Sequence, residues 1–152
     1  MKNNSSKINI IGLSLIVIMI VFILILSIWP IDYGIIIKIN WGISLPRSYR
    51  EESYFVESEP SVLGDGYRYH VFDYKKELNQ EDIGKFNSEK NEEIENNIEE
   101  ILNYLKIDHE KRPNFSEKYY WYTKTDNIDS HDKLYIIYIP KYNKLYVIEE
   151  FM

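Results

Sequence analysis

The chain has 152 residues, no cysteine, and 24 acidic against 18 basic residues, a formal charge of −6. The absence of cysteine excludes disulfides, thiolate metal sites, a cysteine nucleophile and a lipid-modified cysteine. Lys2 and Lys7 are the only charged side chains before Trp29, so the remainder of the chain carries a charge of −8. Such an acidic module is a poor ligand for nucleic acid and for anionic lipid head groups.

The first predicted element is a transmembrane helix over residues 8–29. These 22 residues contain no charged side chain, and Leu15 to Leu26 has no polar face that would suit a soluble helix. At about 1.5 Å per residue, the segment spans the roughly 30 Å hydrocarbon core of a bilayer. We therefore expect a short tail at 1–7, the membrane helix at 8–29, in contact with lipid, and one soluble domain at 30–152.

A cleaved signal peptide is the alternative interpretation of this segment, since Lys2 and Lys7 form a basic leader. The apolar run exceeds the usual signal-peptide core of about 7–15 residues, and Ser27 to Ile31 lacks a small-x-small cleavage pattern. These features favour an uncleaved, single-pass anchor. The two lysines predict a cytoplasmic N-terminus, which places the domain outside the cell membrane.

Three strands are predicted after the anchor. Ile35 to Asn40 is a β-branched run that predicts a first strand or an extended stalk, and Ser53 to Glu57 and Tyr67 to Tyr74 predict a hairpin with a long loop. Alternation along the last of these places Tyr67, Tyr69, Val71 and Asp73 on one face. His70 and its alternate neighbours lie on the other face.

A polar connection over Lys75 to Asn87 leads to the clearest helix of the domain, predicted at Ser88 to Ile107 with Ser88 as its N-cap. Apolar side chains recur at helical spacing and form one stripe for packing on a sheet. The stripe consists of Ile94, Ile98, Ile101, Leu102 and Leu105. Glutamates cover the opposite surface.

Three further strands are predicted at Lys118 to Lys124, Leu134 to Ile139 and Lys144 to Glu149. Pro140 to Asn143 predicts a tight turn between the last two, because proline presets the turn and asparagine tolerates a positive φ. The expected domain is therefore α+β, with the order β-β-β-α-β-β-β, an antiparallel sheet and one helix packed on it.

No catalytic, cofactor or metal motif stands out. His70, His109 and His131 are the only histidines, and no pair of them has metal-ligand spacing. The acidic loop from Thr125 to Asp132 lacks the alternate ligands and the glycine of a calcium loop. The sequence indicates no cofactor. An envelope hydrolase that uses His70 or His131 with nearby aspartates is the alternative function; for His70 these are Asp65 and Asp73.

The unusual feature is aromatic content, with 14 tyrosines and three tryptophans. They are densest at Tyr119, Tyr120, Trp121 and Tyr122. Strands favour aromatic residues for packing, yet consecutive ones must point to both faces, so an exposed row could bind a partner. These four residues are the candidate binding site. The expected partner is an envelope polymer or a neighbouring membrane protein.

Short strings distributed over the domain carry a resemblance. They are Gly64 to Tyr67, Tyr119-Tyr120, Ile137-Tyr138, Asn143 to Tyr146 and Glu149-Glu150. In these the chain resembles small membrane-anchored proteins of low-GC Gram-positive bacteria. The resemblance implies an anchor and this domain layout, and it implies no particular activity. The expected function is a non-catalytic, extracytoplasmic binding or accessory module; a cytoplasmic regulator would require the opposite orientation.

Overall fold

The computed structural model describes residues 15–21, 32–46, 50–59, 65–126 and 131–152. The chain divides into two units, Met1–Ile36 and Ile37–Met152. In the first unit, residues 15–21 are helical. The predicted tail at 1–7 and most of the predicted span at 8–29 lie outside the described residues. None of the helices in the described ranges combines the length and the apolar character that crossing a bilayer requires.

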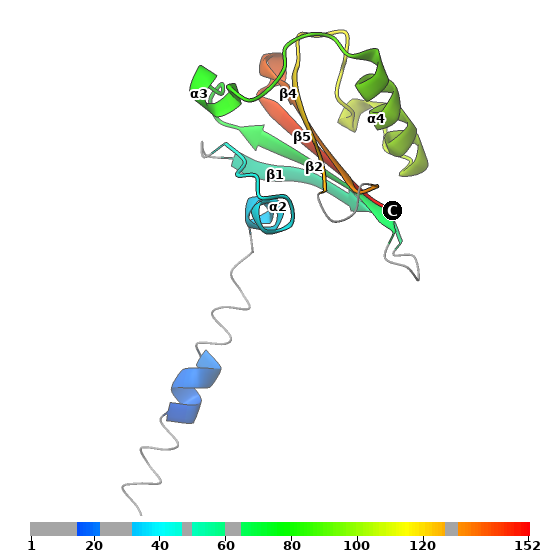
Figure 1. Ribbon diagram of the computed structural model, residues 1–152. Coiled ribbons are helices and arrows are strands. Elements are labelled where there is room, and N and C mark those ends of the chain that lie inside the picture. Colours follow the sequence, from blue (N-terminus) through cyan, green and yellow to red (C-terminus); the bar gives the residue numbers. More distant parts are fainter. Residues whose placement is uncertain (1–14, 22–31, 47–49, 60–64, 127–130) are drawn as a thin grey trace, which may run out of the picture. The chain divides into compact units, whose positions relative to one another are not determined.

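The second unit is built on a five-stranded antiparallel sheet in the order β1-β2-β5-β4-β3 (Figure 1). The prediction of an α+β fold with an antiparallel sheet is confirmed. Each strand begins and ends within two residues of the predicted bounds, except that the first strand of the sheet begins earlier, at Arg50 instead of Ser53. Their bounds are Arg50–Glu57 (β1), Gly66–Tyr74 (β2), Tyr120–Thr125 (β3), Lys133–Ile139 (β4) and Lys144–Phe151 (β5).

The predicted first strand at Ile35 to Asn40 is wrong, because Tyr33–Trp41 forms the helix α2. A short apolar run in a sequence fits either a strand or a buried helix. In this segment the burial of the side chains follows helical spacing. Ile37 and Trp41, four residues apart, are buried, whereas Ile39 is exposed. Gly42 ends the helix in the left-handed region, at φ +65°, and its amide donates to Lys38 O at 2.9 Å.

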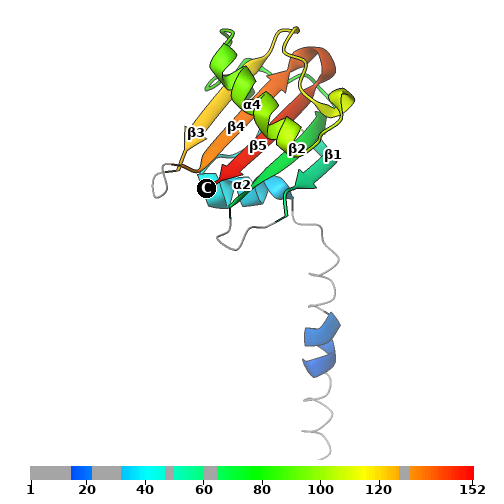
Figure 2. The ribbon, with the colours of Figure 1, turned by 90° about the vertical axis from the view of Figure 1, so that its right-hand side faces the viewer.

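The helix α4, Glu92–Tyr104, crosses one face of the sheet (Figure 2). We call this the α4 face. The predicted apolar stripe is confirmed, since four of its members are buried and Leu105 packs at the edge of the same cluster. The predicted N-cap is wrong: Asn91, not Ser88, caps the helix, and its side chain accepts a hydrogen bond from Ile94 N at 3.1 Å.

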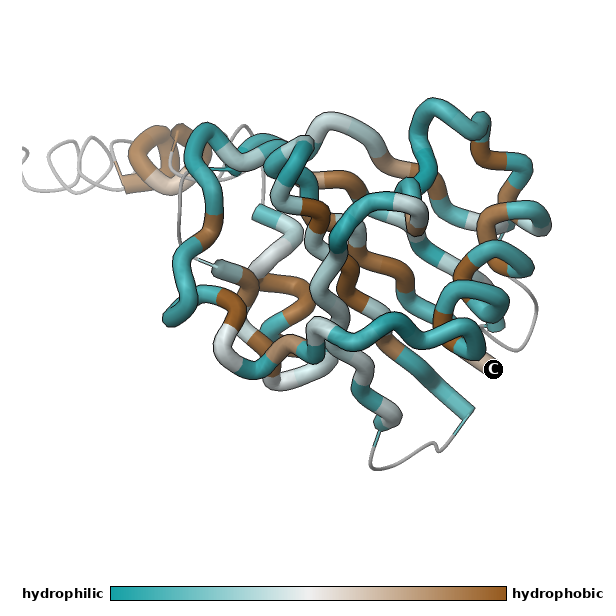
Figure 3. Tube along the Cα trace, turned by 90° about the horizontal axis from the view of Figure 1, so that it is seen from above, coloured by the Kyte–Doolittle hydropathy of each residue, from teal (hydrophilic) through white to brown (hydrophobic). Residues whose placement is uncertain are grey.

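The opposite face, the α2 face, is covered as well, whereas the prediction had one packed helix. Figure 1 shows α4 and the C-terminal part of α2 on opposite sides of the sheet. The connection from Lys75 to Asn87 contains a short helix, α3 (Gln80–Ile83), and buries Leu78 and Ile83. Hydrophobic segments consequently occupy the interior of the domain and hydrophilic ones its outer loops (Figure 3). The three central strands are buried on both faces.

Two single 3-10 turns and one short pairing at the sheet edge complete the fold. The predicted turn is confirmed: Pro140–Tyr142 forms a single 3-10 turn (η2), followed by Asn143 at φ +51°. A second such turn, His109–Lys111 (η1), follows α4. At the outer edge of β3, the backbone of Asn87 pairs with Trp121 through two hydrogen bonds of 2.8 and 2.9 Å. The connection before α4 therefore covers part of that edge.

Candidate functional site

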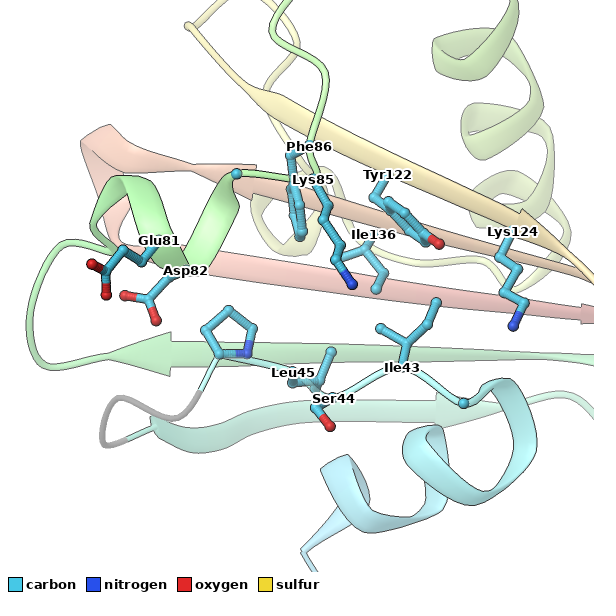
Figure 4. Close-up of a pocket in the computed structure, with 13 residues that line it drawn as sticks. Ile43, Ser44, Leu45, Glu81, Asp82, Lys85, Phe86, Tyr122, Lys124 and Ile136 are labelled. Carbon is cyan, nitrogen blue, oxygen red and sulfur yellow. The ribbon is translucent and has the colours of Figure 1, made fainter.

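A cavity of about 410 Å³ opens on the α2 face (Figure 4). Its floor consists of Tyr122 from β3 and Ile136 from β4. One wall is the segment Gly42 to Pro46, directly after α2, and the other is α3 with the residues Gly84 to Phe86. Rigid strands thus hold the floor, and two connections form the walls.

Two ammonium groups and a phenol hydroxyl line one half of this cavity. Figure 4 shows Lys85 and Tyr122 reaching into the space above Ile136, with Lys124 beside them. Lys85 is exposed and forms no ion pair or hydrogen bond with another described residue. Lys124 Nζ donates to Trp41 O at 2.6 Å. Because an ammonium group has three hydrogens, Lys124 retains two donors for a ligand.

The other half of the cavity is acidic. Glu81 and Asp82 lie at that end, on α3 (Figure 4). Asp82 is already engaged, since it accepts a hydrogen bond from Asn79 N at 3.1 Å in the capping box of α3. Apolar side chains from both walls lie between the two ends. The cavity therefore suits a ligand with an anionic group next to a small apolar body.

The four predicted binding aromatics are divided by the sheet. Tyr119 is buried, and its hydroxyl accepts from Asn91 N at 3.0 Å and donates to Glu95 Oε1 at 2.6 Å. Tyr120 stacks on a tyrosine of β4, and the Trp121 indole donates to a backbone carbonyl before α4. Only Tyr122 lines the cavity. That the four residues form a binding site remains a prediction; the structure places them in different surroundings.

His70 has different surroundings from those expected. The imidazole ring lies on the α2 face and is 1% exposed. It stacks on the Phe55 ring, with the two ring centroids 4.4 Å apart, and its Nδ1 contacts Glu52 Oε1. Burial, with the positive charge of Arg68, lowers the pKa of His70 to about 3. The ring is therefore neutral at pH 7, and we infer that Nδ1–H donates to the Glu52 carboxylate.

The two aspartates expected near His70 lie elsewhere in the domain. Asp73 is on the α4 face, where Lys144 Nζ donates to it at 2.5 Å, and Asp65 lies before β2. His131 is exposed, and the neighbouring residues 127–130 are outside the described part of the chain. Within the described ranges, no three His, Asp or Glu side chains are grouped to hold a metal ion.

Sequence reasoning missed Lys85, Lys124 and the wall from Gly42 to Pro46. For Lys124 a signal was present, because it alternates with Tyr122 along β3 and therefore shares its face. For Lys85 there was none, since its approach to the sheet depends on the path of a polar connection. Comparisons of the chain with protein-family models, with curated proteins and with solved structures found no match.

Proposed function

We propose that this chain is a single-pass membrane protein whose C-terminal domain is a non-catalytic binding module on the outer side of the cell membrane. The 22 uncharged residues at 8–29 support the anchor, and residues 15–21 within them are helical. Lys2 and Lys7 support the orientation. The burial of His70 against Glu52 supports a role in structure over one in catalysis.

We place the binding site of this module in the cavity of the α2 face. The observation that carries this assignment is that two lysines, Lys85 and Lys124, line one cavity on either side of Tyr122, in a domain that is otherwise strongly acidic. Two ammonium donors and one hydroxyl donor match the oxygens of a phosphate or a carboxylate. The ligand is accordingly an acidic envelope component, such as a polymer with phosphate or carboxylate groups.

The position of the cavity in the chain fits a membrane-anchored module. Gly42, in its first wall, follows the predicted membrane helix by only 12 intervening residues. The first wall of the cavity and the proposed anchor are therefore close together in the sequence. The hydrogen bond from Lys124 Nζ to Trp41 O also connects the cavity to α2. The same ammonium group lines the cavity and contacts the last residue of that helix.

Glycerol phosphate is a suitable probe, with glycerol as its uncharged control. The full chain in maltoside micelles should bind glycerol phosphate and not glycerol, measured by calorimetry. Lys85→Gln should weaken binding by about three- to tenfold, since it removes one partly exposed charge-assisted donor. The matched control is Lys76→Gln, which changes an exposed lysine outside the cavity. Equal loss in both variants would contradict the site.

Orientation needs its own test. A reporter that is active only outside the cytoplasm, fused after Met152, should be active in cells. Activity of a cytoplasmic reporter in its place would overturn the outer location and favour an inward-facing regulator.

A further inference from the structure

A second cavity lies on the α4 face, where α4 meets the ends of three strands. Its volume is about 260 Å³. Tyr67 comes from the start of β2, Tyr135 from β4, Glu150 from the end of β5, and Tyr104 from the last turn of α4. This volume is below the roughly 300–1,000 Å³ of sites for drug-sized molecules, which indicates a small ligand or a head group.

Two tyrosine rings form a corner of this cavity. The rings of Tyr67 and Tyr104 are 5.1 Å apart with an interplanar angle of 62°. Tyr104 is 66% exposed and forms the rim, whereas Tyr135 is 3% exposed and lies at the base. A cation in such a corner faces the electron-rich surface of more than one ring, the arrangement with which proteins bind organic ammonium groups.

The charges around the rings favour a cation as well. Glu100 and Glu150 line the cavity with Lys133, a net charge of −1. Burial raises the pKa of Tyr67, and the charges of Glu150, the neighbouring Tyr104 and Glu100 raise it further, so both carboxylates act on the ring. Burial and Glu150 raise the pKa of Tyr135 to about 12. The phenols therefore stay neutral.

We propose that this cavity binds a small organic ammonium group, held by the faces of Tyr67 and Tyr104 and by the carboxylates of Glu100 and Glu150. An organic ammonium is less strongly hydrated than a metal ion and gains from aromatic contact, whereas a divalent metal requires a shell of oxygen ligands. The acidic domain attracts cations from a distance. This site is separate from the proposed function, because it lies on the other face of the sheet and takes the opposite charge.

Choline is the probe, and its neutral carbon analogue, in which a tert-butyl group replaces trimethylammonium, is the matched control. The two have nearly the same shape and differ in charge. The full chain in maltoside micelles, which carry no ammonium group, is titrated with each compound and followed by ligand-observed NMR against empty micelles. Choline should bind about tenfold more tightly than the analogue. Equal binding of the two, or no binding of choline, would overturn the proposal.

Variants at the rim locate the site. Tyr104→Leu and Glu100→Gln change exposed side chains of α4, and each should weaken choline binding by about three- to tenfold with unchanged circular dichroism. Tyr142→Leu and Glu92→Gln make the same changes at exposed residues outside the cavity and should leave binding unchanged. A uniform effect in all four variants would show nonspecific attraction and contradict the site. Lys85→Gln should not alter choline binding, which separates this test from that of the first cavity.

Discussion

The ammonium group of Lys124 donates a hydrogen bond to the carbonyl oxygen of Trp41 and so joins β3 to the C-terminal end of α2, 83 residues earlier in the chain. Carbonyls in the last turn of a helix have no partner within the helix and carry its partial negative charge. A lysine at this end of the helix donates the missing hydrogen bond to the carbonyl, and its positive charge offsets the partial negative charge.

Lys124→Met should lower the free energy of unfolding by about 1 kcal/mol, because it removes this bond and leaves a carbonyl unsatisfied. The measurement is urea unfolding of the full chain in maltoside micelles, followed by tryptophan fluorescence. Lys85→Met is the control, since Lys85 has no bond to another described residue and should change stability by less than about 0.5 kcal/mol. A larger loss in the Lys85 variant would contradict the structural role of Lys124.

Trp41→Phe should destabilise the domain more strongly. The Trp41 indole donates to Glu149 Oε1 at 2.6 Å, and Glu149 is fully buried. Removing one donor from a buried carboxylate costs about 1–3 kcal/mol. Trp121→Phe removes a similar bond to a backbone carbonyl at an exposed site, so its cost in the same unfolding assay should be smaller. Equal losses in the two variants would show that the burial of Glu149 is irrelevant.

Acid should destabilise the domain through His70. The pKa of His70 is lowered to about 3 in the folded chain, from an ordinary value of 6.5. Between these pH values the unfolded chain binds a proton that the folded chain does not. The free energy of unfolding is therefore unaffected by His70 above pH 6.5 and falls as the pH decreases toward 3. The loss between pH 7 and pH 5 should be about 2 kcal/mol.

His70→Phe removes this titration and retains a ring that can stack on Phe55. The variant should therefore show a flatter dependence of stability on pH between 7 and 5 than the unaltered chain, in paired unfolding curves. The variant also removes the contact between the ring and the Glu52 carboxylate, which lowers stability at every pH and leaves the comparison of slopes valid. An unchanged slope would mean that other groups cause the acid sensitivity.

Tyr119 and Tyr122 should separate stability from binding. Tyr119→Phe removes a buried hydroxyl bonded to Asn91 N and Glu95, and it should lower the free energy of unfolding by about 1–2 kcal/mol without altering the affinity for glycerol phosphate. Tyr122→Phe removes a hydroxyl that lines the cavity, so it should weaken binding with little change in stability. The opposite pattern would return the binding role to the buried tyrosine.

Much of the α4 face could be predicted from the sequence, because its buried residues recur with the period of a helix or of a strand. Ile94 and Ile98 repeat with the period of a helix, and Tyr69 and Val71 alternate with residues of the other face. The turn at Pro140 to Asn143 has its own chemistry, and the positive φ of Asn143 follows from it. These signals are local, and they need no knowledge of the rest of the fold.

The α2 face could not be predicted in the same way. Leu134 to Ile139 is hydrophobic at every position, and such a run does not reveal that a second layer covers the strand. The segment that forms α2 is rich in isoleucine, a composition that is typical of a strand. The cavity depends on two connections, Gly42 to Pro46 and Gly84 to Phe86, that meet only after folding, so Lys85 and Tyr122 carry no shared signal in the sequence.

The cover on both faces of the central strands has a consequence for how the domain opens. β5 lies between β2 and β4, and all of its residues from Leu145 to Glu149 are buried. Detachment of either helical layer would expose apolar surface of the same strand to water, so partial opening is nearly as costly as complete loss of structure. The backbone amides at the middle of β5 should therefore exchange with deuterium only through global, cooperative unfolding.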